Sequence, residues 1–357
     1  MHDTNKGTPD MPGRFPLMGP VMATLVTLVS LAGCATRHDG PLSDHFDGRV
    51  FRNEEPPPPG AFWKFLRWQL LEPGIAWPDH LPVEQDLPPP HVHGDSIRVS
   101  YVGHATVLVQ VAGVNILTDP VWSERASPLS FAGPKRVREA GVAFERLPPI
   151  DIVLVSHNHY DHLDTATLAK LWDRDRPLIV TPLGNLGTMR GKSKDLQAVE
   201  LDWGQTVHAG AVQITAEPMQ HWSARGPIDQ NLALWAAFVM KTPSGTLYFA
   251  GDTGYGSGTH FKSTREKHGP MRLAILPIGG YEPQWFVGYA HMTPEEAVKA
   301  GTDLGAEHVL GHHWATFRMT NESIDEPGQR FATAAERAKL GPDRYRSLLP
   351  GMAWLIE

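Results

Sequence analysis

Short apolar runs separated by turn residues predict most of the strands in this chain. The run Ile152-Val153-Leu154-Val155 contains no polar residue, which is typical of a strand buried on both faces of a sheet. Further strands are predicted over 97–100, 106–111, 114–120, 212–216, 237–241 and 246–251. Several of these pair as hairpins, with turns at Ala112-Gly113 and Pro243-Ser244-Gly245. Two sheets built from such hairpins, with helices outside them, predict an α/β sandwich.

A dense group of polar residues follows the buried strand and reads His157-Asn158-His159-Tyr160-Asp161-His162. His157 and His159 are two positions apart on an extended loop, so their rings can converge on one cation. Asp161 and His162 come where a helix over 163–172 is predicted to begin, and the turn aims them at a different point. The spacing therefore predicts two neighbouring metal positions. The alternative is a polar turn of ordinary histidines that cap the core.

The same six residues match the HxHxDH motif and resemble the metallo-β-lactamase-fold hydrolases. The resemblance implies an αββα four-layer sandwich with a binuclear site that usually holds two Zn²⁺ ions. Three later residues complete the ligand set of that family, namely His221, Asp252 and His313. His221 would join His157 and His159, His313 would join Asp161 and His162, and Asp252 would bridge the two cations.

Roles beyond metal binding are also implied by the resemblance. Asp161 and Asp252 are assigned to catalysis as well as to metal binding. His104 and Asp119 would orient ligands through hydrogen bonds rather than bind metal, although a capped turn with a satisfied histidine explains them nearly as well. His312 competes with His313 for the last ligand position, and the following residues 314–317 align better when His313 is the ligand.

A narrower resemblance is to the N-acylphosphatidylethanolamine-hydrolysing phospholipases D. It is carried by blocks between residues 62 and 317, among them 65–68, 125–128, 133–136, 156–164, 251–255, 277–279, 281–283, 285–286 and 294–297. It implies a membrane phospholipid substrate, cleaved to phosphatidic acid and an N-acylethanolamine. Tyr160 and His291 fall where those enzymes contact substrate, whereas Ala290 departs from the polar residue expected there. Tyr160 could instead simply pack against its neighbours, and His291 could cap a helix beginning at Thr293.

Composition and charge restrict the class of partner and the ligand chemistry. The chain has 357 residues, of which 41% are hydrophobic and 20% charged, and its formal net charge of -7 argues against a nucleic-acid partner. Its single cysteine, Cys34, lies near the N-terminus, so no cysteine is available as a metal ligand in the hydrolase part. A set of nitrogen and oxygen ligands on both metals favours phosphate esters as substrates.

The first 95 residues divide into a leader and an extension. Residues 1–33 read as a lipoprotein signal peptide, because an apolar run over 21–32 ends in Leu31-Ala32-Gly33-Cys34, which resembles a lipobox with Cys34 as the lipidated residue. We therefore expect a protein of the bacterial cell envelope, anchored by lipid to the outer membrane. Residues 34–95 form a proline-rich extension, and 96–357 the hydrolase domain. Within the extension, the Trp- and Leu-rich stretch 62–71 is predicted to lie at a lipid interface or to dock on the hydrolase domain.

Other functions remain open at this level. A lactonase of the sugar-phosphate branch or a β-lactamase would use the same metals, and a lipoprotein without enzymatic activity could influence envelope permeability. The last reading is disfavoured because all seven ligand positions are filled. A homodimer is compatible with the sequence. The expected partners are a membrane phospholipid and, through the anchor, a membrane surface.

Overall fold

The computed structural model describes residues 37–58, 67–68 and 74–357. The predicted signal peptide, Cys34 and most of the stretch 62–71 lie outside the described residues. Arg67 and Trp68 of that stretch are helical. No helix among the described residues is long and apolar enough to cross a membrane. The division of the chain at residues 33 and 95 stays a prediction.

The first sheet has seven strands in the order β14-β1-β2-β3-β4-β5-β6. Strands β14, β1, β2 and β3 pair antiparallel, and β3 to β6 pair parallel. The strands are β1 (Ile97–Gly103), β2 (Thr106–Val111), β3 (Val114–Thr118), β4 (Ile152–Leu154), β5 (Leu178–Pro182), β6 (Val199–Leu201) and β14 (Ala353–Ile356).

The second sheet repeats this arrangement with seven strands in the order β13-β12-β11-β10-β9-β8-β7. Strands β7 to β10 are antiparallel and β10 to β13 are parallel. The strands are β7 (Thr206–Ala209), β8 (Val212–Glu217), β9 (Ala237–Thr242), β10 (Gly245–Phe249), β11 (Leu273–Pro277), β12 (His308–His312) and β13 (Tyr345–Ser347).

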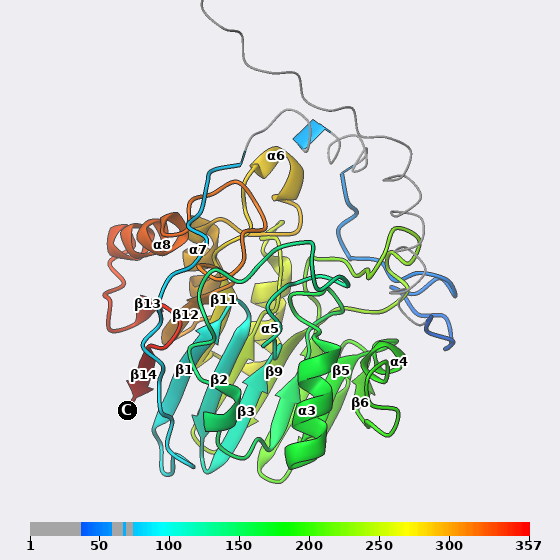
Figure 1. The fold of residues 1–357 in the computed structure, drawn as a ribbon, viewed down its shortest axis with the longest axis horizontal. Coiled ribbons are helices and arrows are strands. Elements are labelled where there is room, and N and C mark those ends of the chain that lie inside the picture. Colours follow the sequence, from blue (N-terminus) through cyan, green and yellow to red (C-terminus); the bar gives the residue numbers. More distant parts are fainter. Residues whose placement is uncertain (1–36, 59–66, 69–73) are drawn as a thin grey trace, which may run out of the picture.

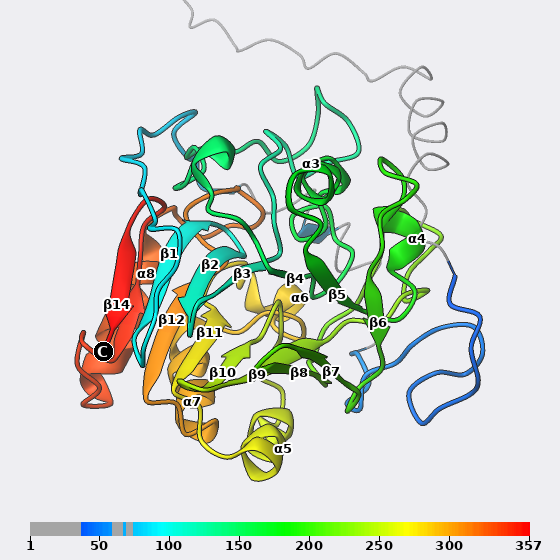
Figure 2. The ribbon, with the colours of Figure 1, turned by 90° about the horizontal axis from the view of Figure 1, so that it is seen from below.

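Helices cover the outer faces of the two stacked sheets (Figures 1 and 2). In Figure 2, α3 and α4 lie on the side of the first sheet, and α5 and α7 on the side of the second. The helices are η1 (Phe144–Arg146), α3 (Thr165–Asp175), α4 (Leu186–Met189), α5 (Thr259–His268), α6 (Gln284–Val287), α7 (Pro294–Asp303) and α8 (Glu326–Arg337). The predicted αββα four-layer sandwich is confirmed.

The main core lies between the two sheets because both present apolar side chains to each other. Strand β2 is buried along its whole length, and so is β4. A second apolar cluster, which includes Leu168 and Leu171 of α3, fills the space between that helix and the first sheet. Asp164 caps α3 by accepting hydrogen bonds from the N–H groups of Ala166 and Thr167, an interaction typically worth about 1 kcal/mol. This cap fixes the point at which the polar loop after β4 ends.

Part of the N-terminal extension packs on the sandwich rather than acting only as a spacer. Phe46 and Phe51 are 3% and 0% exposed and belong to the main core cluster. The N–H of Phe51 donates to the carbonyl of Asn231 at 2.9 Å. The extension therefore contributes to the core, and the residues just after Phe51 run close to the loop that follows β8.

Candidate metal centre

The predicted ligands meet at one end of the sandwich, where loops leave strands of both sheets. In Figure 1 this is the upper end, where α6 also lies. The buried polar loop after β4 carries His157, His159, Asp161 and His162, the loop after β8 carries His221, the turn after β10 carries Asp252, and His313 directly follows β12. All seven residues predicted from the sequence thus lie together, although they are up to 156 positions apart in the chain.

His157, His159 and His221 form one group of ring nitrogens. Nε2 of His157 lies 2.8 Å and Nε2 of His221 lies 3.3 Å from Nδ1 of His159. Burial lowers the pKa of His159 to about 4 and holds the pKa values of the other two well below the usual range. The rings are therefore neutral near pH 7, with lone pairs free to bind a cation.

In two residues of this group, the hydrogen-bond partner of Nδ1 determines the tautomer of the ring. Nδ1 of His221 donates to the carbonyl of Ala290 at 3.0 Å, which leaves Nε2 as the ligand atom. Nδ1 of His157 lies 2.9 Å from the hydroxyl of Ser156. Ser156 is in turn held by Asp119, which accepts from its N–H at 2.7 Å and from its hydroxyl at 2.6 Å. Such partners fix a ligand ring before the metal arrives.

Asp161, His162 and His313 form the second group, and Asp252 lies between the two groups. Oδ2 of Asp252 is 3.1 Å from Nε2 of His162, 3.0 Å from Nε2 of His313 and 3.9 Å from Nε2 of His221. Oδ2 of Asp161 is 3.5 Å and 3.6 Å from the same atoms of His162 and His313. The carboxylate of Asp252 therefore reaches ligands of both groups.

The two residues predicted to support the ligands lie directly behind this second group. Nε2 of His104 is 2.8 Å from Oδ2 of Asp161, and Nδ1 of His162 is 2.6 Å from Oδ2 of Asp119. Both supporting residues have positive φ angles, 57° for His104 and 31° for Asp119, and so does His313 at 66°. Such backbone strain in non-glycine residues is common at functional sites, where the surrounding structure holds it.

The charges of the second group also fit a cation. Burial opposes ionisation of both rings, but the charges of the neighbouring carboxylates and the hydrogen bonds to them together outweigh it. They raise the pKa of His313 to about 9 and the pKa of His162 well above its usual value. The carboxyl pKa values of Asp161 and Asp252 are held well below the usual range by these histidines. Oδ1 of Asp252 is buried and makes no hydrogen bond within the described part of the chain. A bound metal would satisfy this oxygen and replace the protons of the histidines.

Two side chains predicted to contact substrate lie at the edges of this centre. His291 forms a close group with His221 and Asp252, and its Nδ1 lies 3.9 Å from Oδ2 of Asp252. The alternative prediction, that His291 caps α7, is wrong, because Thr293 caps this helix in a capping box with Glu296. Tyr160 packs beside a small apolar cluster, and the guanidinium of Arg225 lies over its ring. This agrees with the alternative that Tyr160 simply packs against its neighbours. Contact of either residue with substrate stays a prediction.

His312 and His313 differ in where their rings lie, as expected for successive residues at a strand end. His313 belongs to a close group with His104, Asp161 and His162, whereas His312 belongs to none of the possible metal groups among the described residues. The ring of His312 packs 5.5 Å from that of Phe249 instead. His313 thus lies within reach of the second group and His312 does not, while the ligand role of His313 stays a prediction.

Arg225 was not predicted from the sequence, yet it holds both ends of the ligand loop. Its Nη1 donates to the carbonyls of Asn158 and Leu163 at 3.0 and 2.8 Å, and its guanidinium carbon lies 3.6 Å from the ring centroid of Tyr160. Asp229 fixes the Arg225 loop by accepting from the Arg225 N–H at 3.1 Å. The only sequence signal is an arginine four residues after a ligand, which is too weak to interpret alone.

Comparison with known proteins agrees with this arrangement. The model of the family described as "Beta-lactamase superfamily domain" matches residues 114–314. The chain belongs to the β-lactamase superfamily. It is a metal-dependent hydrolase of the metallo-β-lactamase fold, with a His/Asp cluster capable of binding metal.

Relatives of this superfamily member differ in what their names state. An uncharacterized protein of Mycobacterium tuberculosis is 38% identical over 281 residues, which cover 76% of this chain and 73% of that protein. An N-acyl-phosphatidylethanolamine-hydrolyzing phospholipase D of Caenorhabditis elegans is 39% identical, covering 66% of this chain and 69% of the other. Outer membrane protein RomA of Klebsiella pneumoniae is 43% identical over 96 residues, 27% of this chain and 69% of that protein.

A solved structure supports the same fold for this superfamily member. The metallo hydrolase Igni18 of Ignicoccus hospitalis aligns with a TM-score of 0.54 at 23% identity, and the alignment covers 73% of this chain and 99% of the other. At this identity, the likeness concerns the fold alone.

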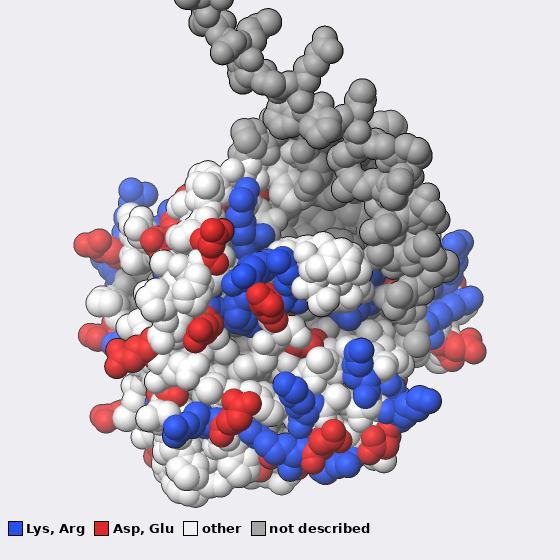
Figure 3. Space-filling model, viewed as in Figure 1, with Lys and Arg blue, Asp and Glu red and all other residues white. Residues whose placement is uncertain are grey.

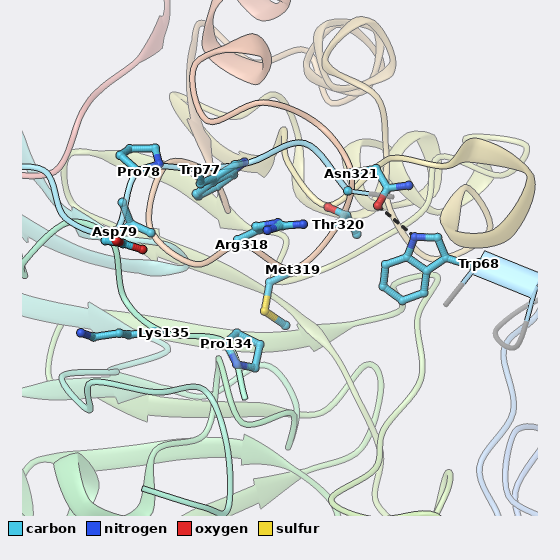
Figure 4. A pocket seen from close by; sticks show the side chains of 12 residues that line it. Trp68, Trp77, Pro78, Asp79, Pro134, Lys135, Arg318, Met319, Thr320 and Asn321 are labelled. Carbon is cyan, nitrogen blue, oxygen red and sulfur yellow. Dashed lines mark hydrogen bonds between the residues drawn. The ribbon is translucent and has the colours of Figure 1, made fainter. Parts of the chain in front are cut away.

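Figure 4 shows the lining of a cavity of about 590 Å³ in this superfamily member. Its lining combines Trp68, Trp77 and Met319 with the cationic side chains Lys135 and Arg318. A smaller cavity shares Trp77, Met319 and Thr320 with it and is also lined by His104 and His313. The larger cavity therefore adjoins the smaller one, which reaches the second ligand group, and its volume suits a small organic ligand or part of a lipid.

Proposed function

We propose that this chain is a phosphodiesterase of the phospholipase D type, which uses two Zn²⁺ ions to hydrolyse N-acylphosphatidylethanolamine to N-acylethanolamine and phosphatidic acid. The observation that carries the proposal is the placement of Asp252 between two groups of nitrogen and oxygen ligands. The nematode relative named as an N-acyl-phosphatidylethanolamine-hydrolyzing phospholipase D adds support for the substrate class.

His157, His159 and His221 would hold one ion, Asp161, His162 and His313 the other, and Asp252 both. When bound, such a pair of ions supplies a water of lowered pKa and neutralises charge on a phosphoryl group. The role of the protein is to hold the ligands in place beforehand. Asp119 acts on ligands of both groups, through Ser156 and through His162. His104 holds the Asp161 carboxylate.

Tyr160 and His291 are the side chains that we expect to orient a substrate next to the ions. Burial lowers the pKa of His291 to about 4, so its ring is neutral near pH 7 and can accept a hydrogen bond or donate one, according to its tautomer. Tyr160 is held by stacking on Arg225, which limits the positions that its hydroxyl can take. We infer that these two side chains bind the head group, while the acyl chains lie elsewhere.

The cavity beside the centre is the best place for an apolar part of the lipid. Trp68, Trp77 and Met319 provide apolar walls, and Arg318 adds a positive charge that suits a phospholipid. Trp68 belongs to the stretch 62–71, and its ring lies 5.5 Å from that of Phe286 in α6. We propose that this end of the sandwich faces the membrane, with aromatic side chains of α6 and the extension at the interface.

We also propose a location at the outer membrane, which rests on the predicted lipid anchor. A lipid anchor on Cys34 would hold the protein at the outer membrane, and the partial similarity to a protein named as an outer membrane protein is in keeping with this location. The face shown in Figure 3 carries interspersed acidic and basic side chains. Such a mixed surface gives no reason to assume electrostatic binding of a polyanion such as nucleic acid.

Product identification tests the proposed reaction directly. The purified, zinc-loaded protein would be incubated with vesicles of N-acyl and plain phosphatidylethanolamines, and separately with a sugar-phosphate lactone and a β-lactam. We expect phosphatidic acid and N-acylethanolamine, identified by mass, from the N-acylated lipid. Hydrolysis of the lactone or the β-lactam without lipid cleavage would replace the proposed substrate class with that of the respective branch.

A further inference from the structure

Asn53, in the N-terminal extension, contacts both polar main-chain atoms of His221. Its Nδ2 donates to the His221 carbonyl at 2.6 Å, and its Oδ1 accepts from the His221 N–H at 3.3 Å. The same Oδ1 accepts from the indole N–H of Trp235 at 2.8 Å. One amide side chain thus pairs with the main chain of a predicted ligand, and a buried indole fixes its orientation.

A second chain of contacts links Asn53 to the ring of His221. Nδ2 of Asn53 also donates to the hydroxyl of Tyr289 at 2.5 Å. The next residue, Ala290, provides the carbonyl that accepts from Nδ1 of His221 at 3.0 Å. Asn53 is therefore connected both to the backbone of His221 and to the segment that sets the tautomer and direction of its ring.

The extension is anchored firmly enough to act as a support. Phe51, two residues before Asn53, is fully buried and its ring lies 4.5 Å from that of Phe46. Two residues after Asn53, the carbonyl of Glu55 accepts from the hydroxyl of Tyr289 at 3.0 Å and from Nε2 of Gln220 at 3.2 Å. Contacts on both sides of Asn53 thus hold it against the loop.

His221 needs such a support because of its place in the fold. It lies four residues beyond the end of β8 (Val212–Glu217), so the strand ladder does not fix its main chain. Each of the three ring nitrogens of its group must stay within about 0.5 Å of its productive position for a metal to bind all of them. We propose that Asn53 is a positioning residue that holds His221 in register with His157 and His159, although it lies outside the part of the chain, 114–314, that matches the superfamily.

Zinc titration of the full chain against a competing chelator tests this inference, with the visible spectrum of the cobalt-loaded protein as a second readout. The chain is expected to bind two equivalents of zinc. We expect Asn53→Ala to lower the affinity for one of these equivalents by about 10–100-fold and to leave the affinity for the other unchanged. Asn53→Asp keeps the acceptor for the His221 N–H but loses the donor, so we expect it to weaken the same equivalent. The cobalt spectrum should change for that equivalent alone.

Matched variants separate positioning from general stability. Arg52 is the exposed neighbour of Asn53 and pairs with Asp47. The Arg52→Ala variant should bind both equivalents of zinc normally. Phe331→Leu, at a fully buried position of α8, should lower the unfolding temperature without selectively weakening the binding of one zinc ion. If Asn53→Ala does not fold, Tyr289→Phe provides the test, because it removes the hydroxyl that Asn53 contacts and should selectively weaken the same equivalent.

The inference is overturned if the folded variants of Asn53 or Tyr289 bind both equivalents as the unsubstituted chain does, or lose both equally. The positioning role of Asn53 rests on the proposed ligand role of His221, and the His221→Ala variant tests that ligand role separately. Loss of one equivalent in His221→Ala but not in the Asn53 variants would contradict the positioning role alone. An unaffected His221→Ala would contradict the ligand role itself.

Discussion

Nδ1 of His162 donates to Oδ2 of Asp119 across 2.6 Å, and both side chains are completely buried. This contact leaves Nε2 of His162 facing Asp252. The same carboxylate accepts two hydrogen bonds from Ser156, whose hydroxyl contacts the ring of His157. Asp119 therefore contacts His162 directly and His157 through Ser156, and so orients one histidine in each proposed metal position.

Replacing this carboxylate should weaken metal binding at both positions. In Asp119→Asn, the amide removes the negative charge beside His162 and can offer a donor where an acceptor is needed, so we expect zinc affinity to fall about 10–100-fold. Competition with a fluorescent zinc chelator measures the change. Asp173→Asn, at an exposed position of α3, is the control and should bind zinc normally. Unchanged affinity in Asp119→Asn would show that the histidine is oriented by other means.

Asp252→Asn should leave a folded protein that has lost most of its turnover. The amide oxygen cannot balance two cations, so we expect the metal content to fall below two per chain and most of the hydrolysis to be lost. Metal analysis and circular dichroism on the same preparation separate this effect from unfolding. Near-normal hydrolysis by the variant would refute the bridging role of Asp252.

Metal binding should depend on pH through His313. In the metal-free protein burial lowers the pKa of this ring, but the charge of Asp252 and hydrogen bonds to Asp252 and Asp161 together raise it to about 9. The proton must leave before Nε2 can bind zinc. We therefore expect zinc affinity to rise with pH from about 6.5 to about 9. The metal-free fold should lose stability over the same range, because a raised pKa stabilises the folded state only while the ring is protonated. Zinc titrations in buffers of pH 6 to 9.5 measure the first effect, and a flat profile would contradict it.

The cavity beside the centre should matter for lipids more than for small substrates. Trp77→Ala removes an apolar wall, and we expect a several-fold loss of activity on phospholipid vesicles with little change on a short soluble phosphodiester. Arg318→Ala should act in the same direction. Ile75→Ala, at an exposed position of the same segment, serves as the control. Equal losses on both substrates would show that the cavity supports the fold rather than binding lipid.

Tyr101 ties together the two strained turns that carry His104 and His313. Its buried hydroxyl lies 3.0 Å from the carbonyls of His104 and Trp314. Tyr101→Phe leaves these carbonyls without that partner, so we expect the free energy of unfolding to fall by about 1–3 kcal/mol. Denaturant unfolding of the metal-free variant measures this, and Tyr248→Phe, whose buried hydroxyl makes no hydrogen bond among the described residues, should have a smaller effect.

Much of the fold follows from local sequence. The predicted strand 106–111 coincides with β2 because its side chains are all apolar or buried and the flanking turns contain glycine. The strand predicted over 246–251 ends at Phe249, since the next residues turn to place Asp252. The ligand loop was recognisable because metal binding needs closely spaced histidines, and the later ligands because the family order is fixed.

Other parts of the site have no sequence signal. Ala290 acts through its carbonyl, which every residue possesses, so its residue type reveals nothing. Asn53 stands in an irregular stretch, and its contacts with His221 exist only once the extension has folded back over the loop after β8. Arg225 likewise acts on carbonyls of a loop more than 60 positions away. Such long-range contacts to the main chain depend on the complete fold, not on local pattern.

Anomalous diffraction at the zinc edge from crystals of the zinc-loaded protein will show whether the seven dispersed side chains hold two cations. We expect two peaks, one bounded by His157, His159 and His221 and the other by Asp161, His162 and His313, with Asp252 contacting both. A single peak, or peaks away from these residues, would contradict it.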